Sequence, residues 1–230
     1  YSVAKFEAID KELASIKDEE SKIELREEAR KAQEENKDSI ILVYIAERIL
    51  ISLRPHEYNL RLNNMLLTFY EAGNWDVVKY LGDLILSHSE SSKALRVLAD
   101  VAEHQGDEDK KWEYYERFVK ADSSDKDIII TLADHYEEIG DRKAAMNYYQ
   151  RALLRLQKSD DADRIKDVFG RLLENGRSAY PFYSSFTESM AERDSATGLE
   201  LYRMLLSYLS NALSAFDPKS SEYRSSLDSI

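Results

Sequence analysis

The sequence predicts an all-α protein, a right-handed solenoid in which antiparallel helix pairs stack side by side. The segment LADVAEHQGDEDKKWEYYERFV, which begins at Leu98, returns 34 residues later as LADHYEEIGDRKAAMNYYQRAL. A fixed period of this length is typical of stacked helical repeats. Only 7 glycines and 3 prolines occur among the 230 residues, while 33% of the residues are charged and 43% are hydrophobic. This composition suits amphipathic helices and leaves little material for turns.

Residues 1–57 predict an irregular helical region. Apolar side chains recur every three or four positions over residues 2–16, which indicates one helix. The next segment, DEESKIELREEARKAQEEN, has few apolar side chains to bury. It predicts a solvent-facing helix supported by opposite charges four residues apart. Residues 39–53 are far more apolar, so we expect a buried helix there, which Pro55 ends.

Residues 58–159 predict three helix pairs, and the clearest pair starts at Lys126. Gly140 should end its first helix, because glycine adopts the left-handed conformation after a helix at no steric cost. Asp141 should then cap the second helix. Seven residues have the spacing of inward-facing positions: Ile129, Leu132, Ala133 and Tyr136 on the first helix, and Ala145, Tyr149 and Ala152 on the second.

Two earlier copies follow the same pattern less closely. The copy before Lys126 keeps Gly106 but has Lys111 and Phe118 where alanine is expected. The first copy is degenerate, and its Gly73 precedes Gly106 by 33 residues instead of 34. Its apolar positions are Leu62, Met65, Leu66, Phe69 and Ile85. Together the copies are similar to the tetratricopeptide (TPR) repeat, in which each unit is a helix, a turn and a second helix.

Residues 160–230 predict degenerate helical repeats that are truncated. We expect a helix over residues 162–174, which the segment NGRS breaks. The segment YPFYSSFTESMAE then begins a helix with Pro181 near its first turn, where proline is favoured. A further amphipathic helix is expected over residues 199–215. The last segment, DPKSSEYRSSLDSI, resembles the opening of another unit, so we expect the natural chain to continue.

No motif in the sequence indicates catalysis, a cofactor or a metal site. The chain has no cysteine, no HExxH motif and no glycine-rich phosphate loop. Its four histidines are scattered singly, and although His104 and His135 fall on neighbouring predicted helices, no suitably spaced ligand set accompanies them. We therefore expect surface histidines, no cofactor and no enzymatic activity.

Charge and hydropathy limit the classes of partner. Acidic residues outnumber basic ones by 44 to 32, which gives a net charge of −12, and Lys/Arg clusters never exceed two residues. Direct nucleic-acid binding is disfavoured, because phosphate neutralisation needs a basic patch. The longest apolar stretch is about 14 residues, too short to span a bilayer. The absence of cysteine fits a reducing compartment, so we expect a cytoplasmic protein that does not bind membranes.

The tyrosines invite two interpretations. Tyr115 and Tyr149 fall at helix-packing positions, so we expect them in the core. Tyr114, Tyr148 and Tyr183 are less constrained, so the sequence leaves open whether they pack in the core or are exposed to stack on bases or to contact a peptide.

Beyond the repeat, the middle of the chain resembles one family. The segments NWDVVKYLGDLIL, SSKALRVLADVAE and KKWEYYERF follow each other in an order that the repeat consensus alone does not demand. Over residues 36–174 the chain is similar to the helical, TPR-like N-terminal extension of long bacterial GreA-type transcription elongation (transcript cleavage) factors. The resemblance implies an accessory module acting with RNA polymerase. The acidic coiled-coil tip that assists RNA cleavage in that family has no counterpart here.

A second interpretation stays open, because KKWEYYERF also looks like the half-TPR repeats of RNA-processing scaffolds. A general TPR adaptor that binds other proteins is a further alternative. The sequence after residue 230 would separate them: a Gre-type coiled coil supports the first interpretation, and continued Trp and Tyr-Glu-Arg repeats support the second. Both interpretations describe a non-enzymatic protein-protein interaction module whose oligomeric state the sequence does not predict.

The TPR resemblance also implies where a partner would bind. In such arrays the first helix of each pair lines a concave groove. Lys93 and Arg96 resemble the start of a clamp for a C-terminal carboxylate, but Asp100 and Asp134 would repel that group. We therefore predict a groove that is apolar at its N-terminal end and acidic at its C-terminal end, suited to a basic or mixed peptide segment; a solvated spacer face is the alternative. The predicted partner-binding residues are Tyr70, Lys93, Arg96, Asp100, Glu103, Asp134, Glu137 and Glu138.

Overall fold

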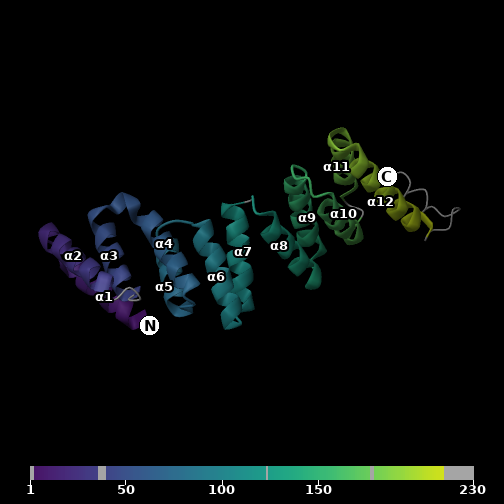
Figure 1. Cartoon of the computed structure of the whole chain (residues 1–230). Helices are drawn as coiled ribbons and strands as arrows, with labels where there is room; N and C mark the ends of the chain where they lie inside the picture. Colours follow the sequence, from purple (N-terminus) through teal and green to yellow (C-terminus); the bar gives the residue numbers. More distant parts are fainter. Residues whose placement is uncertain (1–2, 36–39, 123, 177–178, 215–230) are drawn as a thin grey trace. The chain divides into compact units, whose positions relative to one another are not determined.

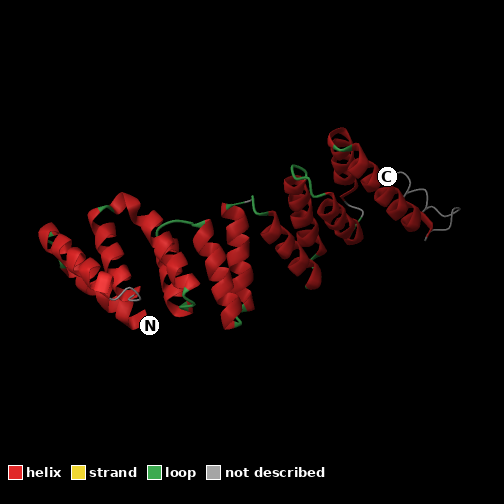
Figure 2. Ribbon diagram, in the orientation of Figure 1, coloured by secondary structure: helices red, strands yellow, loops and turns green. Residues whose placement is uncertain are grey.

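The computed structural model describes residues 3–35, 40–122, 124–176 and 179–214, and the regular structure in these ranges is helical, without a strand. Figure 2 shows the helices joined by short loops. Within each of the two compact units described below, the helices pack in adjacent pairs, as they do in a helical-repeat solenoid. The predicted all-α class is therefore confirmed. No helix among the described residues is long and apolar enough to cross a membrane.

The chain divides into two compact units, Tyr1–Asp122 (unit 1) and Ser123–Ile230 (unit 2). The helices of unit 1 are α1 (Val3–Ser15), α2 (Glu19–Glu35), α3 (Ile40–Leu53), α4 (Tyr58–Glu71), α5 (Trp75–Leu86), α6 (Ser92–Gln105) and α7 (Glu108–Ala121). Those of unit 2 are α8 (Lys126–Glu138), α9 (Arg142–Leu156), α10 (Ala162–Asn175), α11 (Tyr180–Arg193) and α12 (Ser195–Ser214). The two units are defined by how the helices pack. The sequence-based boundaries after residues 57 and 159 are not tested by this division and stay a prediction.

The N-terminal helices follow the sequence pattern. α1 and α3 lie within a residue of their predicted bounds, apart from Ser39, which falls outside the described residues. α2 buries only Ala29, as expected for a solvent-facing helix. Pro55 stops α3 and opens a short 3-10 helix, Pro55–Glu57. Proline favours this position because its fixed φ suits a first helical residue and its missing N–H would have no partner there.

The 34-residue period is a period of structure as well as of sequence. α6 and α8 begin 34 residues apart, and so do α7 and α9. Gly106 and Gly140 have φ of 71° and 81°, the left-handed conformation that ends the first helix of each pair. The Asp141 carboxylate accepts a hydrogen bond of 3.0 Å from the Ala144 N–H at the start of α9. The predicted glycine stop and aspartate cap are both confirmed.

The core of the α8–α9 pair contains the residues that the sequence placed there. Six of the seven predicted inward-facing side chains are fully buried: Ile129, Leu132, Ala133, Ala145, Tyr149 and Ala152. The seventh, Tyr136, is half-buried and stacks on Tyr148, with ring centroids 5.5 Å apart. In unit 1 the five predicted apolar positions of the first copy are buried as well. The small alanines let the paired helices approach closely, which is why they recur.

α1 is held to unit 1 by one aromatic and one acidic side chain. Phe6 is fully buried and makes edge-to-face contacts with Tyr44 (4.7 Å between centroids) and Phe69 (5.5 Å). Asp10 accepts hydrogen bonds from the Arg48 Nε (2.7 Å) and the Tyr80 hydroxyl (2.8 Å). Burial, followed by the bond to Asp10, raises the pKa of Tyr80 to about 12, so the phenol stays protonated and remains a donor.

The helices of unit 2 after α9 match their predicted positions, with one exception. α10 ends at Asn175, and α11 begins with Pro181 in its first turn, as predicted. α12 begins at Ser195 instead of the predicted Leu199. The prediction was wrong because it took the first apolar residue as the start of the helix. Asp194 instead caps the helix, which therefore begins four residues before Leu199. The predicted break, NGRS, begins where α10 ends and Gly176 follows it; its last two residues, 177–178, and the final segment, residues 217–230, fall outside the described residues.

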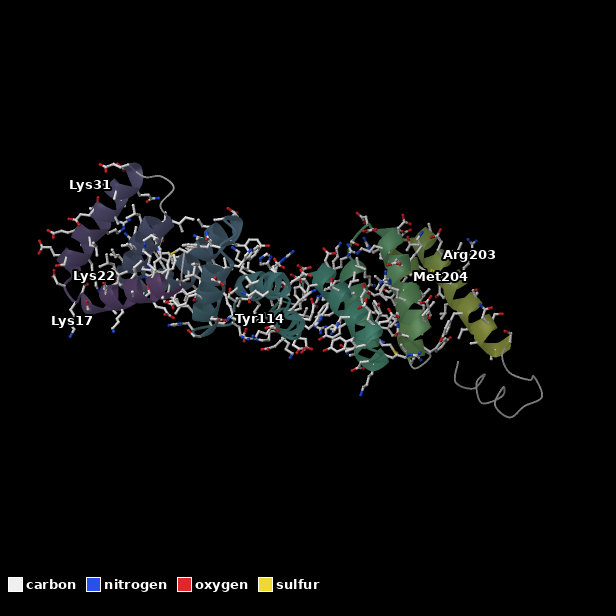
Figure 3. All side chains as sticks on the ribbon, turned by 90° about the horizontal axis from the view of Figure 1, so that it is seen from below. Lys17, Lys22, Lys31, Tyr114, Arg203 and Met204 are labelled. Atoms are coloured by element: carbon white, nitrogen blue, oxygen red, sulfur yellow. The ribbon has the colours of Figure 1, made fainter. Side chains whose placement is uncertain are left out.

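Two of the three tyrosines whose position the sequence left open are buried. Tyr114 is 9% exposed in unit 1 and is labelled in Figure 3, whereas Tyr115, expected in the core, is half-buried. Tyr183 is 1% exposed, and its hydroxyl lies 2.9 Å from the Leu172 carbonyl oxygen and 2.5 Å from that of Gly176, so it donates to one of them at a time. These bonds satisfy carbonyls at the end of α10 that have no partner within the helix. Tyr148 is half-buried.

Acid should weaken the start of α12 through Asp194. Its carboxylate accepts bonds from the Thr197 hydroxyl and from the N–H groups of Thr197 and Ala196, and these hold its pKa below the usual range. A depressed folded-state pKa gives stability that is present above the unfolded pKa, about 4, and is lost as the pH falls through the folded value. Asp194→Asn keeps a capping oxygen but does not titrate. We expect α12 amides of the native chain to lose more exchange protection than those of the variant between pH 5 and pH 3. Equal losses would contradict this.

Candidate partner-binding faces

The eight predicted partner-binding residues lie on first helices of the repeat pairs, in both units. Tyr70 is on α4, and four others are on α6: Lys93, Arg96, Asp100 and Glu103. The remaining three, Asp134, Glu137 and Glu138, are on α8 in unit 2. Each unit therefore carries its own candidate face, and each face is described separately.

In unit 1, side chains of α4 and α6 bond to each other along the two helices. The Tyr70 hydroxyl donates to the Asp100 carboxylate at 2.8 Å. Nearer the start of α6, the Ser91 hydroxyl donates to the Asn63 side-chain oxygen at 3.0 Å. The bond to Asp100, followed by partial burial, raises the pKa of Tyr70. We call this surface the α4–α6 face; its residues are Asn63, Leu67, Tyr70, Lys93, Arg96 and Asp100.

The α4–α6 face combines exposed basic side chains with half-buried apolar ones. Lys93 and Arg96 are exposed on α6, and Leu67 is half-buried on α4. Leu60, about two helical turns before Leu67 on α4, is 64% exposed. The start of α4 therefore exposes an apolar side chain, but the groove itself and its use by a partner stay predictions.

An aromatic cluster borders this face, and sequence reasoning missed it. The indole of Trp75 stacks on the His104 ring with 4.5 Å between centroids, and the Tyr70 ring meets it edge-on at 5.6 Å. A shallow pocket opens beside the cluster; it is lined by Gly73, Asn74, Trp75, Asp76, His104 and Gln105. Trp75 follows the glycine turn of the first copy by two residues. This position next to a turn was the only feature of the sequence that could have indicated the cluster.

Glu103 is held by a lysine at an unusual repeat position. Lys111 stands where the repeat favours alanine, and its side chain is only 12% exposed. Its ammonium bonds to Glu103 at 2.7 Å and lies 4.8 Å from the centre of the Trp112 ring. The aliphatic stem therefore lies along the helix pair while the charge reaches the edge, as long basic side chains commonly do.

In unit 2, Asp134 and Glu137 converge on one buried tyrosine. The Tyr149 hydroxyl lies 2.7 Å from Asp134 Oδ1 and 2.6 Å from Glu137 Oε2. Burial, followed by the bonds to these two carboxylates, raises the Tyr149 pKa. A phenol has one proton, so it donates to one carboxylate at a time. Further donors come from α10: Arg171 Nη1 bonds to Asp134 (2.7 Å) and Asn175 Nδ2 to Glu137 (2.6 Å).

We call these contacts the Tyr149 network. They reduce the negative charge that was expected at the acidic end of the predicted groove. Asp134 and Glu137 are already compensated by side chains of their own chain. At its other end, α10 pairs with one more acid of α8, through Arg164 and Asp127. Glu138 is exposed on α8. The capture of a basic segment here stays a prediction, and of the three acids Glu138 is the one whose charge the helix packing leaves most accessible.

The described residues include no group of three or more His, Cys, Asp or Glu side chains that could hold a metal ion. His104 instead stacks on Trp75, and His135 lies beside the Tyr136 ring at 5.5 Å between centroids. The polar groups that converge in either unit bond one helix to the next. Such arrangements position helices, and the binding role of the side chains exposed on the two faces stays a prediction.

Comparisons with known proteins agree with the resemblance seen in the sequence. No protein-family model matches the chain. The chain is 29% identical over 173 residues to a GreA-associated domains protein of Treponema pallidum (strain Nichols), and 27% identical over 173 residues to the transcription elongation factor GreA of Borreliella burgdorferi. Each match covers 75% of this chain but only 26% and 19% of the respective relative.

The chain thus spans about a quarter of one relative and a fifth of the other. The matches are to two proteins whose names both refer to GreA, and they extend over three quarters of the helical chain described above. The predicted resemblance to a helical domain associated with GreA-type proteins is therefore confirmed.

Proposed function

We propose that this chain is a non-enzymatic protein-binding module, an accessory domain of a GreA-type transcription elongation factor that acts with RNA polymerase in the cytoplasm. The observation that carries the proposal is the similarity, over 75% of the chain, to proteins named for GreA. A protein partner is favoured over nucleic acid because the net charge is −12, and phosphate binding needs basic surface.

The arrangement of the helices supports binding as the physical role. Stacked helix pairs bury their apolar stripes against each other and leave one side of each first helix as continuous surface. On the α4–α6 face this surface holds Lys93 and Arg96 beside Leu67, next to the Trp75 cluster. Aromatic and arginine side chains are the types that contribute most to protein interfaces. We place the partner on this face of unit 1; Glu138, exposed on α8 of unit 2, is a separate candidate contact.

The test is a binding measurement between the purified chain and RNA polymerase purified from the same organism. The double variant Lys93→Glu/Glu138→Lys reverses one charge on each face without changing the net charge. Both side chains are exposed, so folding should not change. We expect the double variant to bind at least 10-fold more weakly than the native chain, because reversed charges at an interface create like-charge contacts.

A matched control reverses the same charges elsewhere in the chain. Lys31→Glu/Glu28→Lys changes two exposed positions of α2, where Lys31 is labelled in Figure 3. This control should bind like the native chain. If the native chain does not bind polymerase, the proposed partner is wrong. If it binds and both double variants retain full affinity, the proposed face is wrong.

A further inference from the structure

The shallow pocket beside Trp75 is formed by three consecutive helices of unit 1. α4, α5 and α6 pack against one another (Figure 1), and the pocket opens where α4 and α6 end and α5 begins. Gly73 has a φ of 69°, the left-handed conformation that ends α4 and redirects the chain into α5. We call this site the Trp75 pocket; its lining residues are Gly73, Asn74, Trp75, Asp76, His104 and Gln105.

The aromatic part of the Trp75 pocket is held in place by its neighbours. The Trp75 indole and the His104 ring are stacked, with 28° between their planes. On α4, the Tyr70 ring meets the indole edge-on, and Tyr70 is itself fixed by the hydrogen bond from its hydroxyl to Asp100. Trp75 is only half-buried. A ligand that contacts an indole already fixed in this way loses little binding energy to the ordering of side chains.

The polar side chains of the Trp75 pocket are free to bind a ligand. In the part of the chain that the structure describes, the side chains of Asn74, Asp76 and Gln105 make no hydrogen bond and no ion pair. Glu103, next to the pocket on α6, is by contrast bonded to Lys111 at 2.7 Å. The pocket therefore presents one carboxylate and two amide groups.

The charges at the Trp75 pocket favour a cation. None of its six lining residues is Lys or Arg, and Asp76 places a negative charge in the first turn of α5. The ends of α4 and α6 add partial negative charge, about −0.5 elementary charge for each helix. The start of α5 contributes about +0.5, which the full charge of Asp76 outweighs. The net charge of −12 disfavours anions further.

Among cations, an arginine side chain matches this lining best. A guanidinium is planar and has five N–H donors in fixed directions, so it can bond to a carboxylate and reach amide oxygens at the same time. It also stacks on aromatic rings, and a cation within ~6 Å of a tryptophan ring is attracted to it. A lysine ammonium is a compact charge with three donors and would satisfy fewer of these groups.

We propose that the Trp75 pocket binds an arginine side chain of a protein partner, with the guanidinium against the Trp75 indole and hydrogen-bonded to the Asp76 carboxylate. The inference rests on the proposed function for the statement that a protein supplies the arginine. Arginine is one of the residue types that contribute most to protein interfaces. Since the pocket borders the α4–α6 face, where Lys93 and Arg96 are exposed, the arginine belongs to a mixed segment that also carries acids.

An NMR titration with short peptides tests the chemistry of the pocket. The chain has two tryptophans, so two indole N–H signals are expected; Trp112→Phe assigns them, and Trp112 on α7 is the internal reference. Acetyl-Gly-Arg-Gly-amide should shift the Trp75 signal in a saturable way and leave the Trp112 signal in place. The same peptide with citrulline, which is planar but uncharged, or with lysine should bind more weakly. A Trp75 signal that does not respond to the arginine peptide, or a citrulline or lysine peptide that binds as tightly, overturns the proposal.

Asp76→Asn removes the charge of the pocket and keeps the size of the side chain. Asp76 is exposed, so the helical CD spectrum should not change. The arginine peptide should bind this variant about 10-fold more weakly, because a hydrogen bond between two charged groups is lost. The matched control is Asp109→Asn, since Asp109 is the exposed second residue of α7, as Asp76 is of α5, and lies outside the pocket. The proposal fails if Asp76→Asn binds like the native chain, or if both variants lose affinity equally.

The same two variants separate this inference from the proposed function. If polymerase supplies the arginine, Asp76→Asn should bind polymerase more weakly than the native chain, and Asp109→Asn should bind it equally well. A native chain that does not bind polymerase overturns the proposed function, whereas the peptide titration still decides the chemistry of the pocket. If the native chain binds polymerase and Asp76→Asn binds it with full affinity, the partner does not place an arginine in the pocket and the inference is overturned.

Discussion

Replacing Gly198 with alanine should destabilise unit 2 by ~3 kcal/mol, because it forces α12 away from α11. A Cβ atom at this position would lie 2.3 Å from the Cα of Ala191 and 2.6 Å from its backbone nitrogen. Backbone atoms cannot rotate aside as the end of a side chain can, so the two helices must separate. We expect the midpoint of thermal unfolding of unit 2 to fall by ~10 °C, with loss of amide-exchange protection concentrated in α11 and α12.

Gly170 provides a matched control, because it is also a glycine inside a helix of unit 2. A Cβ atom there would meet only the terminal methyl of Met204, at 3.4 Å, and this methyl is the flexible end of its side chain. Gly170→Ala should therefore be neutral or should stabilise α10 by up to ~1 kcal/mol through helix propensity. Equal effects of the two substitutions would show that the close approach of α11 and α12 does not limit stability.

The contrast between these glycines marks what could be predicted from the sequence. A glycine that ends a helix is recognisable, because its neighbours supply the cap and the next helix, and Gly140 was predicted on that basis. A glycine inside a helix signals only that some neighbour comes close. Which neighbour, and how close, depends on packing between α11 and α12, where the repeat pattern has faded. Gly198 therefore lacked a local signal that separates it from Gly170.

The paired tyrosines show a similar limit of periodicity. Tyr114-Tyr115 and Tyr148-Tyr149 occupy equivalent positions, and the apolar stripe favoured the second tyrosine of each pair as core. This is correct for Tyr149, but in α7 the first tyrosine is the buried one. The electrostatic neighbours of Tyr114 include Asp83 and Lys79 of α5, so its ring faces the preceding second helix. The apolar stripe of a single helix does not show which side chains contact the neighbouring helix pair.

The acidic residues of α8 illustrate why a charged face is difficult to interpret from sequence. Asp134 and Glu137 are spaced as groove residues, and their positions on a first helix were predicted correctly. Their compensation by Arg171 and Asn175 comes from residues 37 and 38 positions away. That distance is one repeat plus a turn, so the contact needs α10 to pack beside the α8–α9 pair. The sequence thus predicted which helix carries these acids. It did not predict that side chains of α10 would compensate their charge and leave less of it for a partner.

Removal of the Tyr149 hydroxyl is expected to cost ~2 kcal/mol, the amount typical of a hydrogen bond to a charged group in a buried site. Tyr149→Phe keeps the ring that fills the core of the α8–α9 pair and deletes only the donor shared by Asp134 and Glu137. Each carboxylate then keeps one donor from α10, while the repulsion between the two acids is no longer relieved by the phenol. Urea unfolding followed by CD should show the loss, and amide exchange should locate it in α8 to α10.

Tyr115→Phe is the matched control for this substitution, since Tyr115 holds the equivalent position 34 residues earlier. No hydrogen bond involves its hydroxyl among the described residues, although Asp100 and Glu103 on α6 are its electrostatic neighbours. The same atom is deleted in both variants, so we expect Tyr115→Phe to change stability by less than ~0.5 kcal/mol. Two equal and small effects would mean that Asp134 and Glu137 do not depend on the phenol. In that case Arg171 and Asn175 would be enough to hold the acids of α8 in place.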